Sequence, residues 1–437
     1  MCVDNEFRDR PARNKTDFTK FSYITSARAQ KKYDGYKSWD FLEPGVDFEP
    51  YEVEPQLDRV KTFFKAKDWD FSLSKDQEDH VKELMDNNIA IALHEHLNVF
   101  PLSGSHRRRR IYKAFQGLAA SGIDIVFEGG ANPYGPFHTN ETINYIGMSQ
   151  ADYAHQNLIK VCHDYADIEE ALKGEKIALI LSVEHLATIG HEIDMLDLYY
   201  GLGLRQAGIV AFFSNTLGVD KSEHMDSGLS DFGYDCVKRM NKIGLMPELS
   251  HSSDQTAIET IEASDKPIII SHAGSRELFY NVRMFPDEIL KQLADKGGVI
   301  GVEIAGFAPR TKKHPDATIE CMLDHIYHLM EVLGPDHVGI GADTFFGDHA
   351  EMYKTGGETA LKMPSAQRQH NPALPPKLNT YDLRAVTPSA HPFCEGFESP
   401  GDFRNIVKGM IRDGYSDSEI AKVMGQNALR VIKKWFK

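Results

Sequence analysis

The stretch that decides the fold runs from residue 244 to residue 276 and reads GLMPELSHSSDQTAIETIEASDKPIIISHAGSR. Two short apolar runs, 244–250 and 266–271, flank a segment with helical character at 254–265. Runs of this length are typical of strands buried on both faces of a parallel sheet, and the helix would be the crossover between them. A histidine follows each run directly. The stretch therefore predicts one strand–helix repeat of an α/β fold, with polar groups at the strand ends.

Eight apolar runs of this kind occur along the chain, and amphipathic helical segments fall between them. The runs are NIAIAL (88–93), IDIVF (123–127), KIALILSV (176–183), GIVAFF (208–213), GLMPELS (244–250), KPIIIS (266–271), GVIGVEI (298–304) and HVGIGA (337–342). Eight strands alternating with helices predict an α/β fold of the TIM-like (β/α)8 barrel type. A doubly wound open sheet is the alternative, but the first run lacks the glycine fingerprint of its nucleotide-binding versions.

Two parts of the 437-residue chain fall outside this alternation. Residues 1–75 are polar and aromatic, and we expect an N-terminal arm that packs on the main domain or on a second subunit, or a partly ordered extension. Residues 345–400 contain seven prolines and predict a long, lid-like loop after the eighth strand. The barrel domain would then span residues 76–437.

The overall composition excludes several functional classes. Lysine and arginine number 49 against 64 aspartates and glutamates, a formal net charge of −15, which argues against general affinity for nucleic acid or anionic membranes. No run approaches the ~18–20 apolar residues of a membrane span, and the first residues lack the apolar segment of a secretory signal. The five scattered cysteines suit free thiols in a reducing compartment, so we expect a cytoplasmic protein.

Five of the eight runs end in side chains that can bind a metal ion. In chain order these are His94 and His96, Glu184, His251, His272 and Asp343. In a barrel all of them would lie on the C-terminal face, and the two histidines of a His-x-His pair would point to the same side. A single histidine there is more often structural, but the joint placement predicts a metal site. Six such groups exceed what one tetrahedral ion needs, so we expect two divalent ions that share a carboxylate and activate a water.

The motifs resemble a known family. The order His-x-His, Glu, His, His, Asp on eight strands resembles the amidohydrolase superfamily. The stretches GLSDFGYDCVKRMNKIGLMPELSHSS (228–253), KPIIISHAGSRELFYNVRMFPDEIL (266–290), DHVGIGADTF (336–345) and GYSDSEIAKVMGQNALRVI (414–432) resemble the membrane (renal) dipeptidase family of zinc peptidases. The resemblance implies a binuclear metal-dependent hydrolase that cleaves a dipeptide or a similar small amide, with zinc as the ion and manganese or iron as alternatives.

The resemblance also implies a role for each metal ligand. Glu184 would bridge the two ions and count as a catalytic residue. One ion would be completed by His251 and His272, and the other by His94 and His96. Asp343 would be a terminal ligand and would carry a proton to the leaving amine, which makes it the second expected catalytic residue.

Further residues would contact the substrate. Arg283 matches the family's arginine that holds the substrate's C-terminal carboxylate, a contact suited to a guanidinium fork. Glu128 and Glu303, near the ends of strands two and seven, could meet a substrate amine or could be structural. The expected partner is therefore a small molecule with a carboxylate. The resemblance and the aromatic arm predict a homodimer or a higher homo-oligomer.

Two positions depart from the family. The family has His-x-Asp at the first strand, whereas this chain has His-x-His, so His96 removes one negative charge and should make the activated water more acidic or alter the preferred ion. On strand four, the family's histidine for the scissile carbonyl is replaced within VAFFSNTLG (210–218) by Phe212 or Phe213, and Asn215 could supply a donor instead. An N-acyl amino acid, a lactone or a C–C bond is therefore an alternative substrate, and an inactive metal-binding barrel is a further alternative.

Overall fold

A closed parallel β-barrel forms the centre of the molecule in the computed structural model, which describes residues 69–97, 118, 121–130, 139–154, 158–304, 311–315, 318–345, 396–397 and 400–437. Within these ranges eight strands pair in the order β1-β2-β4-β5-β6-β7-β8-β9, and β1 pairs in turn with β9 through Ala92 and Ile340. The strands are β1 (Ile91–His96), β2 (Ile125–Gly130), β4 (Ile177–Val183), β5 (Leu204–Gly208), β6 (Met246–Glu248), β7 (Ile269–Ala273), β8 (Val299–Val302) and β9 (Val338–Ile340). The predicted TIM-like barrel is confirmed, and the open sheet is excluded.

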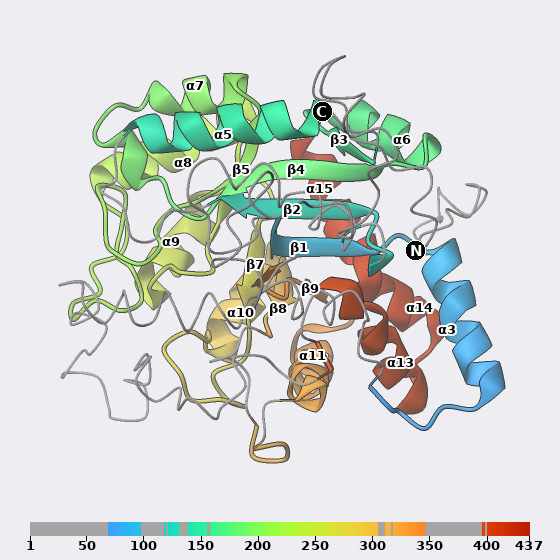
Figure 1. The fold of residues 1–437 in the computed structure, drawn as a ribbon. Coiled ribbons are helices and arrows are strands. Elements are labelled where there is room, and N and C mark those ends of the chain that lie inside the picture. Colours follow the sequence, from blue (N-terminus) through green and yellow to red (C-terminus); the bar gives the residue numbers. More distant parts are fainter. Residues whose placement is uncertain are drawn as a thin grey trace, which may run out of the picture.

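Helices surround the barrel (Figure 1). They are α3 (Lys75–Asn87), α5 (Thr139–Tyr153), α6 (Tyr165–Lys173), α7 (Met195–Gly201), α8 (Asp231–Ile243), α9 (Asp254–Ala263), α10 (Asp287–Asp295), α11 (Ile319–Leu333), α13 (Arg404–Arg412), α14 (Asp417–Ala421) and α15 (Asn427–Trp435), with the short turns η4 (Ala187–Ile189), η6 (Pro400–Asp402) and η7 (Lys422–Gln426). Serine caps start several of them: Ser253 Oγ, for example, accepts from the backbone N–H of Thr256 at 3.2 Å at the start of α9.

Two short strands extend the sheet beyond the ring. β3 (Ile159–Val161) pairs with the first half of β4, and β5 pairs with the second half of the same edge of β4. β10 (Thr344–Phe345) follows β9 and pairs with β1. This last pairing carries the chain past the end of the barrel beside β1, and Asp343 lies at the junction with a positive φ of 57°.

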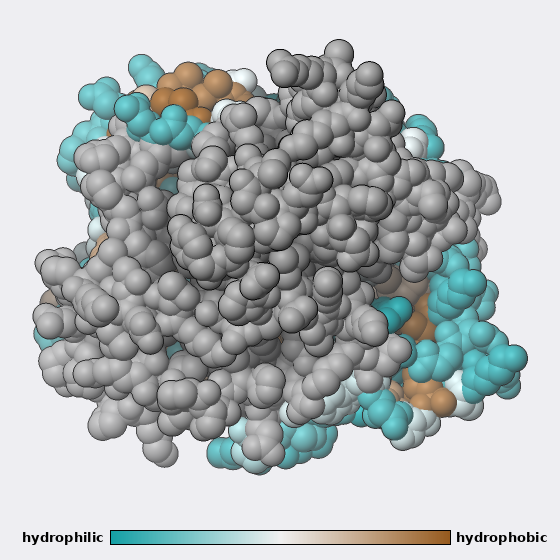
Figure 2. Space-filling view, viewed as in Figure 1, coloured by the Kyte–Doolittle hydropathy of each residue, from teal (hydrophilic) through white to brown (hydrophobic). Residues whose placement is uncertain are grey.

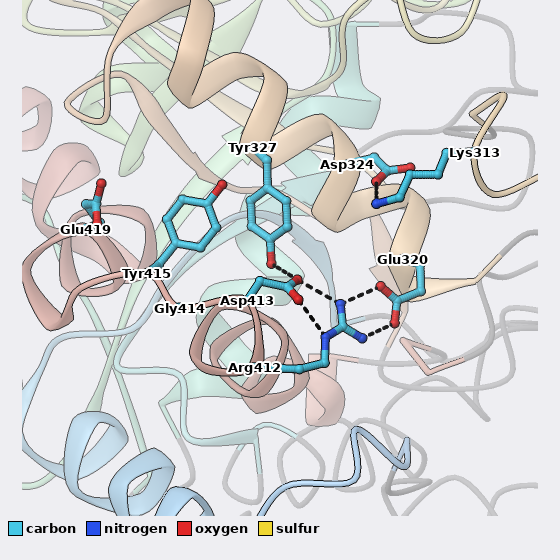
Figure 3. Close-up of a pocket in the computed structure, with 9 residues that line it drawn as sticks. All are labelled: Lys313, Glu320, Asp324, Tyr327, Arg412, Asp413, Gly414, Tyr415 and Glu419. Atoms are coloured by element: carbon cyan, nitrogen blue, oxygen red, sulfur yellow. Dashed lines mark hydrogen bonds and ion pairs between the residues drawn. The ribbon is translucent and has the colours of Figure 1, made fainter.

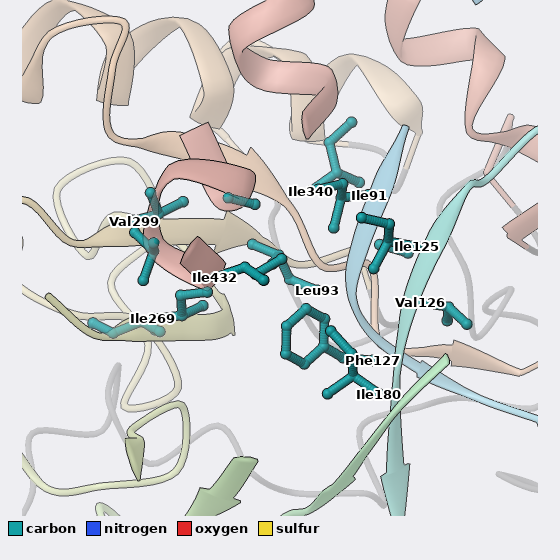
Figure 4. Close-up of a cluster of buried hydrophobic side chains, with 14 of the residues drawn as sticks. Ile91, Leu93, Ile125, Val126, Phe127, Ile180, Ile269, Val299, Ile340 and Ile432 are labelled. Atoms are coloured by element: carbon teal, nitrogen blue, oxygen red, sulfur yellow. The ribbon is translucent and has the colours of Figure 1, made fainter. Parts of the chain in front are cut away.

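Branched and aromatic side chains from both halves of the chain fill the barrel. Figure 4 shows Leu93, Phe127, Ile269 and Val299 with Ile432 of the C-terminal helix, all of them buried. Every residue of β1, β2 and β4 is buried, which explains why these strands appear in the sequence as largely apolar runs.

The C-terminal helix closes the amino-terminal end of the barrel. The indole N–H of Trp435 donates to the carbonyl of Pro267, just before β7, at 2.6 Å. The guanidinium of Arg430 donates to the carbonyls of Gly297 and Asp336, just before β8 and β9, at 2.6 and 2.8 Å. The opposite, carboxyl-terminal end is thus left for the polar residues.

The fourth barrel strand differs from its prediction. The apolar run at 208–213 indicates a strand, but β5 spans Leu204–Gly208 and the run lies mostly beyond it. The polar residues Arg205 and Gln206 interrupt the apolar pattern, so the sequence does not indicate a strand there, yet both side chains make hydrogen bonds in the buried strand. Ser182 Oγ donates to Gln206 Oε1 at 3.0 Å, and Arg205 donates to backbone carbonyls and stacks on Tyr200.

Parts of the predicted domain organisation lie outside the described residues. This holds for residues 1–68 of the expected arm and for 346–395 and 398–399 of the expected lid-like loop. Of the described helices, none combines the length and the apolar character needed to cross a membrane. The described surface in Figure 2 is largely hydrophilic, with an apolar patch over α7, where Leu198 and Leu202 are exposed.

Candidate metal centre

The barrel brings all six predicted metal-binding side chains together at the carboxyl ends of its strands. They are His94 and His96 on β1, Glu184 after β4, His251 after β6, His272 on β7 and Asp343 after β9. Among the described residues, three overlapping groups place their ligand atoms within 4.8 Å of one another. The groups are His94 with His272 and Asp343, His94 with His96 and Glu184, and Glu184 with His251 and His272.

Glu184 lies between two sets of imidazoles. Its Oε1 is 3.7 Å from His94 Nε2 and 3.5 Å from His96 Nε2, whereas its Oε2 is 3.4 Å from His251 Nε2. Burial would raise the pKa of Glu184, but hydrogen bonds from His251 and His94 hold that pKa well below its ordinary value. The carboxylate is therefore ionised and turns one oxygen to each set, which is the arrangement a bridging ligand needs.

The other carboxylate approaches His96. Asp343 Oδ1 is 3.1 Å from His96 Nε2 and 3.6 Å from His94 Nε2. Burial opposes charge on His96, but the bond to Asp343 and the charge of Glu184 raise the pKa of His96 to about 9. The His96 Nδ1 atom lies 2.6 Å from the carbonyl of Gly129, which can only accept, so Nδ1 carries the proton and Nε2 faces the cluster.

The four histidines of the cluster turn their Nε2 atoms toward one another in pairs. The Nε2 atoms of His94 and His96 are 3.3 Å apart, and so are those of His251 and His272. The ring of His272 stacks on that of His94 with centroids 3.8 Å apart, and burial holds the pKa of His272 well below its ordinary value. Imidazole nitrogens that converge on carboxylates form the donor set of zinc-type sites, so the residues fit a metal ion.

Arg283 reaches the edge of this cluster from within the protein. Its guanidinium donates to the Ser250 carbonyl at 2.8 Å and pairs with Glu303 at 3.2 Å, and it lies 3.9 Å from Asp343 Oδ2. Burial, opposed by Arg283 and helped by Asp343, raises the pKa of Glu303 to about 8. Of the two carboxylates considered for a substrate amine, Glu303 thus pairs with Arg283, and Glu128 accepts a hydrogen bond from the Tyr153 hydroxyl.

A second buried cation, Lys221, was not predicted from the sequence. Its ammonium donates to the Arg283 carbonyl at 2.9 Å and lies 4.3 Å from the centre of the Phe285 ring. Burial and the charge of Arg283 hold the pKa of Lys221 well below its ordinary value. A lysine in the polar stretch GVDKSEH reads as a surface residue, so no sequence signal could have placed it here.

The segment after β5 differs from expectation. The Asn215 amide donates to the carbonyl of Ile209 and accepts from the Leu217 N–H, both at 2.8 Å, so it bonds within its own loop. Its predicted contact with a substrate stays a prediction. The ring of Phe212 lies 5.1 Å from that of His251, and its φ of 66° is rare for an aromatic residue. An apolar side chain on a strained backbone therefore borders the site here.

Another hollow, of about 410 Å³, lies outside the barrel among α11, α13 and α14 (Figure 3). Its charged groups are engaged with one another: Arg412 pairs with Glu320 and Asp413, and Lys313 pairs with Asp324.

Sequence comparison places the chain among known proteins. A family model for membrane dipeptidase (peptidase family M19) matches residues 137–365 and 387–435. Dipeptidase tcpJ of Claviceps purpurea is 28% identical over 280 residues, which cover 63% of this chain and 55% of that protein. An uncharacterized dipeptidase of Schizosaccharomyces pombe is 30% identical over 221 residues, 48% of this chain and 53% of the other. The chain thus spans about half the length of these curated relatives.

Solved structures share the fold. An amidohydrolase from Pseudomonas aeruginosa superimposes with a TM-score of 0.66 at 24% identity, covering 82% of this chain and 99% of that one. A metallopeptidase from Rhodobacter sphaeroides, liganded with a phosphinate mimic of the dipeptide L-Ala-D-Ala, gives a TM-score of 0.58 at 18% identity, covering 80% and 99%. At these identities the likeness concerns the barrel alone.

Proposed function

We propose, because the chain belongs to the membrane dipeptidase family, that it is a metal-dependent hydrolase of dipeptides or similarly small amides. The observation that carries the proposal is the position of the Glu184 carboxylate, with one oxygen toward His94 and His96 and the other toward His251. Two ligand sets around one shared carboxylate suit a binuclear centre, and we propose zinc as its metal.

The six strand-end groups would hold the ions. Glu184 would bridge them, and the remaining ligands would be His94, His96, His251, His272 and Asp343. Two divalent ions bound in this way polarise a carbonyl oxygen and lower the pKa of water toward neutrality. The protein's part is to fix these ligands, which the buried and closely packed strand ends support.

Asp343 is the proposed proton carrier. Its carboxylate borders both His96 and Arg283, so it faces the metal ligands on one side and the proposed substrate anchor on the other. The hydrogen bond and charges of the histidines outweigh its burial and lower the pKa of Asp343, so it begins ionised and can accept a proton. It would then deliver that proton to the leaving amine nitrogen.

Arg283 is the proposed anchor for the substrate's carboxylate. Its guanidinium is buried beside Asp343, where a carboxylate bound to it would be held within reach of the proton carrier. This placement supports a substrate with a free carboxyl group close to the scissile bond, as in a dipeptide.

Metal content and activity test the proposal together. Protein expressed with added Zn²⁺ should contain two equivalents of ion per chain, and a dipeptide panel should be hydrolysed more rapidly than N-acyl amino acids or lactones. Chelation should abolish the activity, and Zn²⁺ or Mn²⁺ should restore it.

Two variants sharpen this test. Glu184→Gln should lose both the metal and the activity, whereas Glu288→Gln, an exposed change on α10, should lose neither. Less than one equivalent of bound ion, with no activity recovered on metal addition, would instead favour an inactive barrel.

A further inference from the structure

A chain of buried polar groups lies behind His272, on the side of its ring away from the other ligands. It consists of Glu248 at the end of β6, Ser250 after it, and Ser271 on β7. We propose that Glu248, acting through the Ser271 hydroxyl, fixes the tautomer of His272 and thereby directs the Nε2 lone pair at the metal centre. This role rests on the proposed function, since it concerns how one proposed ligand is prepared.

One carboxylate oxygen of Glu248 accepts hydrogen bonds from both serines of this group. Its Oε1 accepts from the backbone N–H of Ser250 at 2.7 Å and of Ser271 at 2.9 Å. It also accepts from both serine hydroxyls, with Ser271 Oγ at 2.9 Å. Glu248 is 2% exposed and both serines are fully buried, so water does not compete for these bonds.

The direction of the bonds follows from the number of protons. Ser271 Oγ lies 2.7 Å from His272 Nδ1 and 3.2 Å from Ser250 Oγ, and it has one proton to donate, to Glu248, to the imidazole or to Ser250. A carboxylate is the stronger acceptor, so the serine proton goes to Glu248. The serine oxygen then accepts from His272 Nδ1–H, and the proton of this neutral imidazole stays on Nδ1.

The opposite direction would disable the ligand. If Ser271 donated to His272 Nδ1, the imidazole proton would sit on Nε2, the atom that faces His251 Nε2 at 3.3 Å. His272 is a member of two of the three metal-capable groups. A protonated Nε2 has no lone pair to give to an ion.

We call the hydrogen-bonded series Glu248, Ser271 and His272 the relay. The backbone around the relay is held by further contacts. The His272 N–H donates to Ser250 Oγ at 2.9 Å. The carbonyl of Ser271 lies so close to Gly301 and Gly341 that a Cβ at either glycine would overlap it. The backbone of Ser271 therefore packs in close contact with the segments that contain Gly301 and Gly341.

His96 shows the contrast. Its Nδ1 faces a backbone carbonyl, which only accepts, so no side-chain substitution can remove the acceptor that keeps a proton on Nδ1. His272 depends instead on two side chains, and each can be changed by mutation. We therefore expect His272 to be the ligand whose preparation is sensitive to substitutions outside the ligand set.

Nitrogen NMR of histidine-labelled, metal-free protein tests the relay without relying on catalysis. In the wild type, long-range proton–nitrogen spectra should show His272 protonated at Nδ1. Glu248→Gln, which keeps the shape and removes the charge, and Ser271→Ala, which breaks the link, should both move the proton toward Nε2. A wild-type spectrum with the proton on Nε2 would overturn the proposal even if neither variant folds.

Zinc affinity gives the second readout, by competition with a chromophoric chelator. Both variants should bind Zn²⁺ about 10- to 100-fold more weakly, the usual loss when a residue that orients a metal ligand is removed. Ser182→Ala is the matched control, because Ser182 is also a buried barrel serine but donates to Gln206, and its affinity should equal that of the wild type.

Different results would overturn the proposal about the His272 tautomer and the proposal that the protein is a hydrolase. A folded Ser271→Ala variant with wild-type zinc affinity and an unchanged His272 spectrum overturns the relay and leaves the hydrolase proposal standing. A wild type that binds no zinc overturns the hydrolase proposal, whereas the tautomer measured in the metal-free protein still decides whether the relay exists.

Discussion

The guanidinium of Arg283 and the carboxyl group of Glu303 lie 3.2 Å apart, and their side chains are only 2% and 0% exposed. Neither group can exchange its partner for water, and because burial raises the pKa of Glu303 to about 8, its carboxyl group is largely protonated beside the guanidinium at neutral pH. The proposed substrate anchor therefore already has a buried partner, and a substrate carboxylate has to share it.

Arg283→Lys should weaken binding of substrates with a free carboxylate. Lysine keeps the charge but loses the fork, so kcat/KM for dipeptides should fall by about 10- to 100-fold, mainly through KM. Steady-state kinetics on a dipeptide and on its C-terminal amide measure this. An equal loss on both substrates would show that Arg283 does not contact the carboxylate.

Glu303→Gln should change how stability depends on pH. Burial raises the pKa of Glu303 from its ordinary 4.5 to about 8, so between these values the folded state binds more protons than the unfolded state. The free energy of unfolding should then fall as pH rises through this window, because the contribution present below pH 4.5 is lost by pH 8. Urea unfolding of chelated protein at pH 5, 6.5 and 8 should give a shallower decline for the variant than for the wild type.

The exposed substitution Glu288→Gln serves as the control for this measurement and should follow the wild-type curve. Parallel curves for the wild type and Glu303→Gln would mean that Glu303 does not take up a proton in this range.

Gly208→Ala should disturb the placement of Glu184. A Cβ at residue 208 would overlap the main-chain carbonyl of Glu184, and a backbone atom cannot move aside as a flexible side chain can. We expect a loss of about 1–3 kcal/mol in stability, together with weaker metal binding.

Gly201→Ala is the matched control, since a Cβ there meets no atom within 4 Å at the end of α7. It should be neutral or stabilising by up to about 1 kcal/mol. Thermal unfolding and zinc titration of the two variants would contradict the prediction if Gly208→Ala behaved like Gly201→Ala.

His96→Asp should move the acidic limb of the pH–rate profile to higher pH. The aspartate would restore the anionic ligand of the family, and an added negative charge near the ions makes the nucleophilic water less acidic. At this range the charge should shift the limb by about one pH unit or more. An unchanged limb would show that the His-x-His sequence does not tune the reaction.

The sequence predicted which side chains would lie together because barrel geometry makes strand ends converge wherever the helices lie. Six residues at five strand ends needed only the alternation of strands and helices to meet. Arg283 was predicted by family resemblance alone, and its buried partner Glu303 could be given only as one of two alternatives.

The features that could not be predicted from the sequence are hydrogen bonds between buried polar side chains. Arg205 and Gln206 concealed β5, because their hydrogen bonds to other segments are invisible in one dimension. Glu248 and Ser271 read as ordinary polar interruptions of apolar runs, yet they meet across two strands behind His272. Lys221 has no sequence signal, since its burial depends on the path of the chain around Arg283.

The pairing of β1 with β9 has a kinetic consequence. The contact between Ala92 and Ile340 joins the first strand of the ring to the last, and the helix that closes the base of the ring ends at Trp435. Contacts between such distant segments pay a large loop-closure cost and form late in folding. His94 and Asp343 cannot meet until the ribosome has released the chain beyond Asp343, so the candidate metal centre can form only late in synthesis or after it.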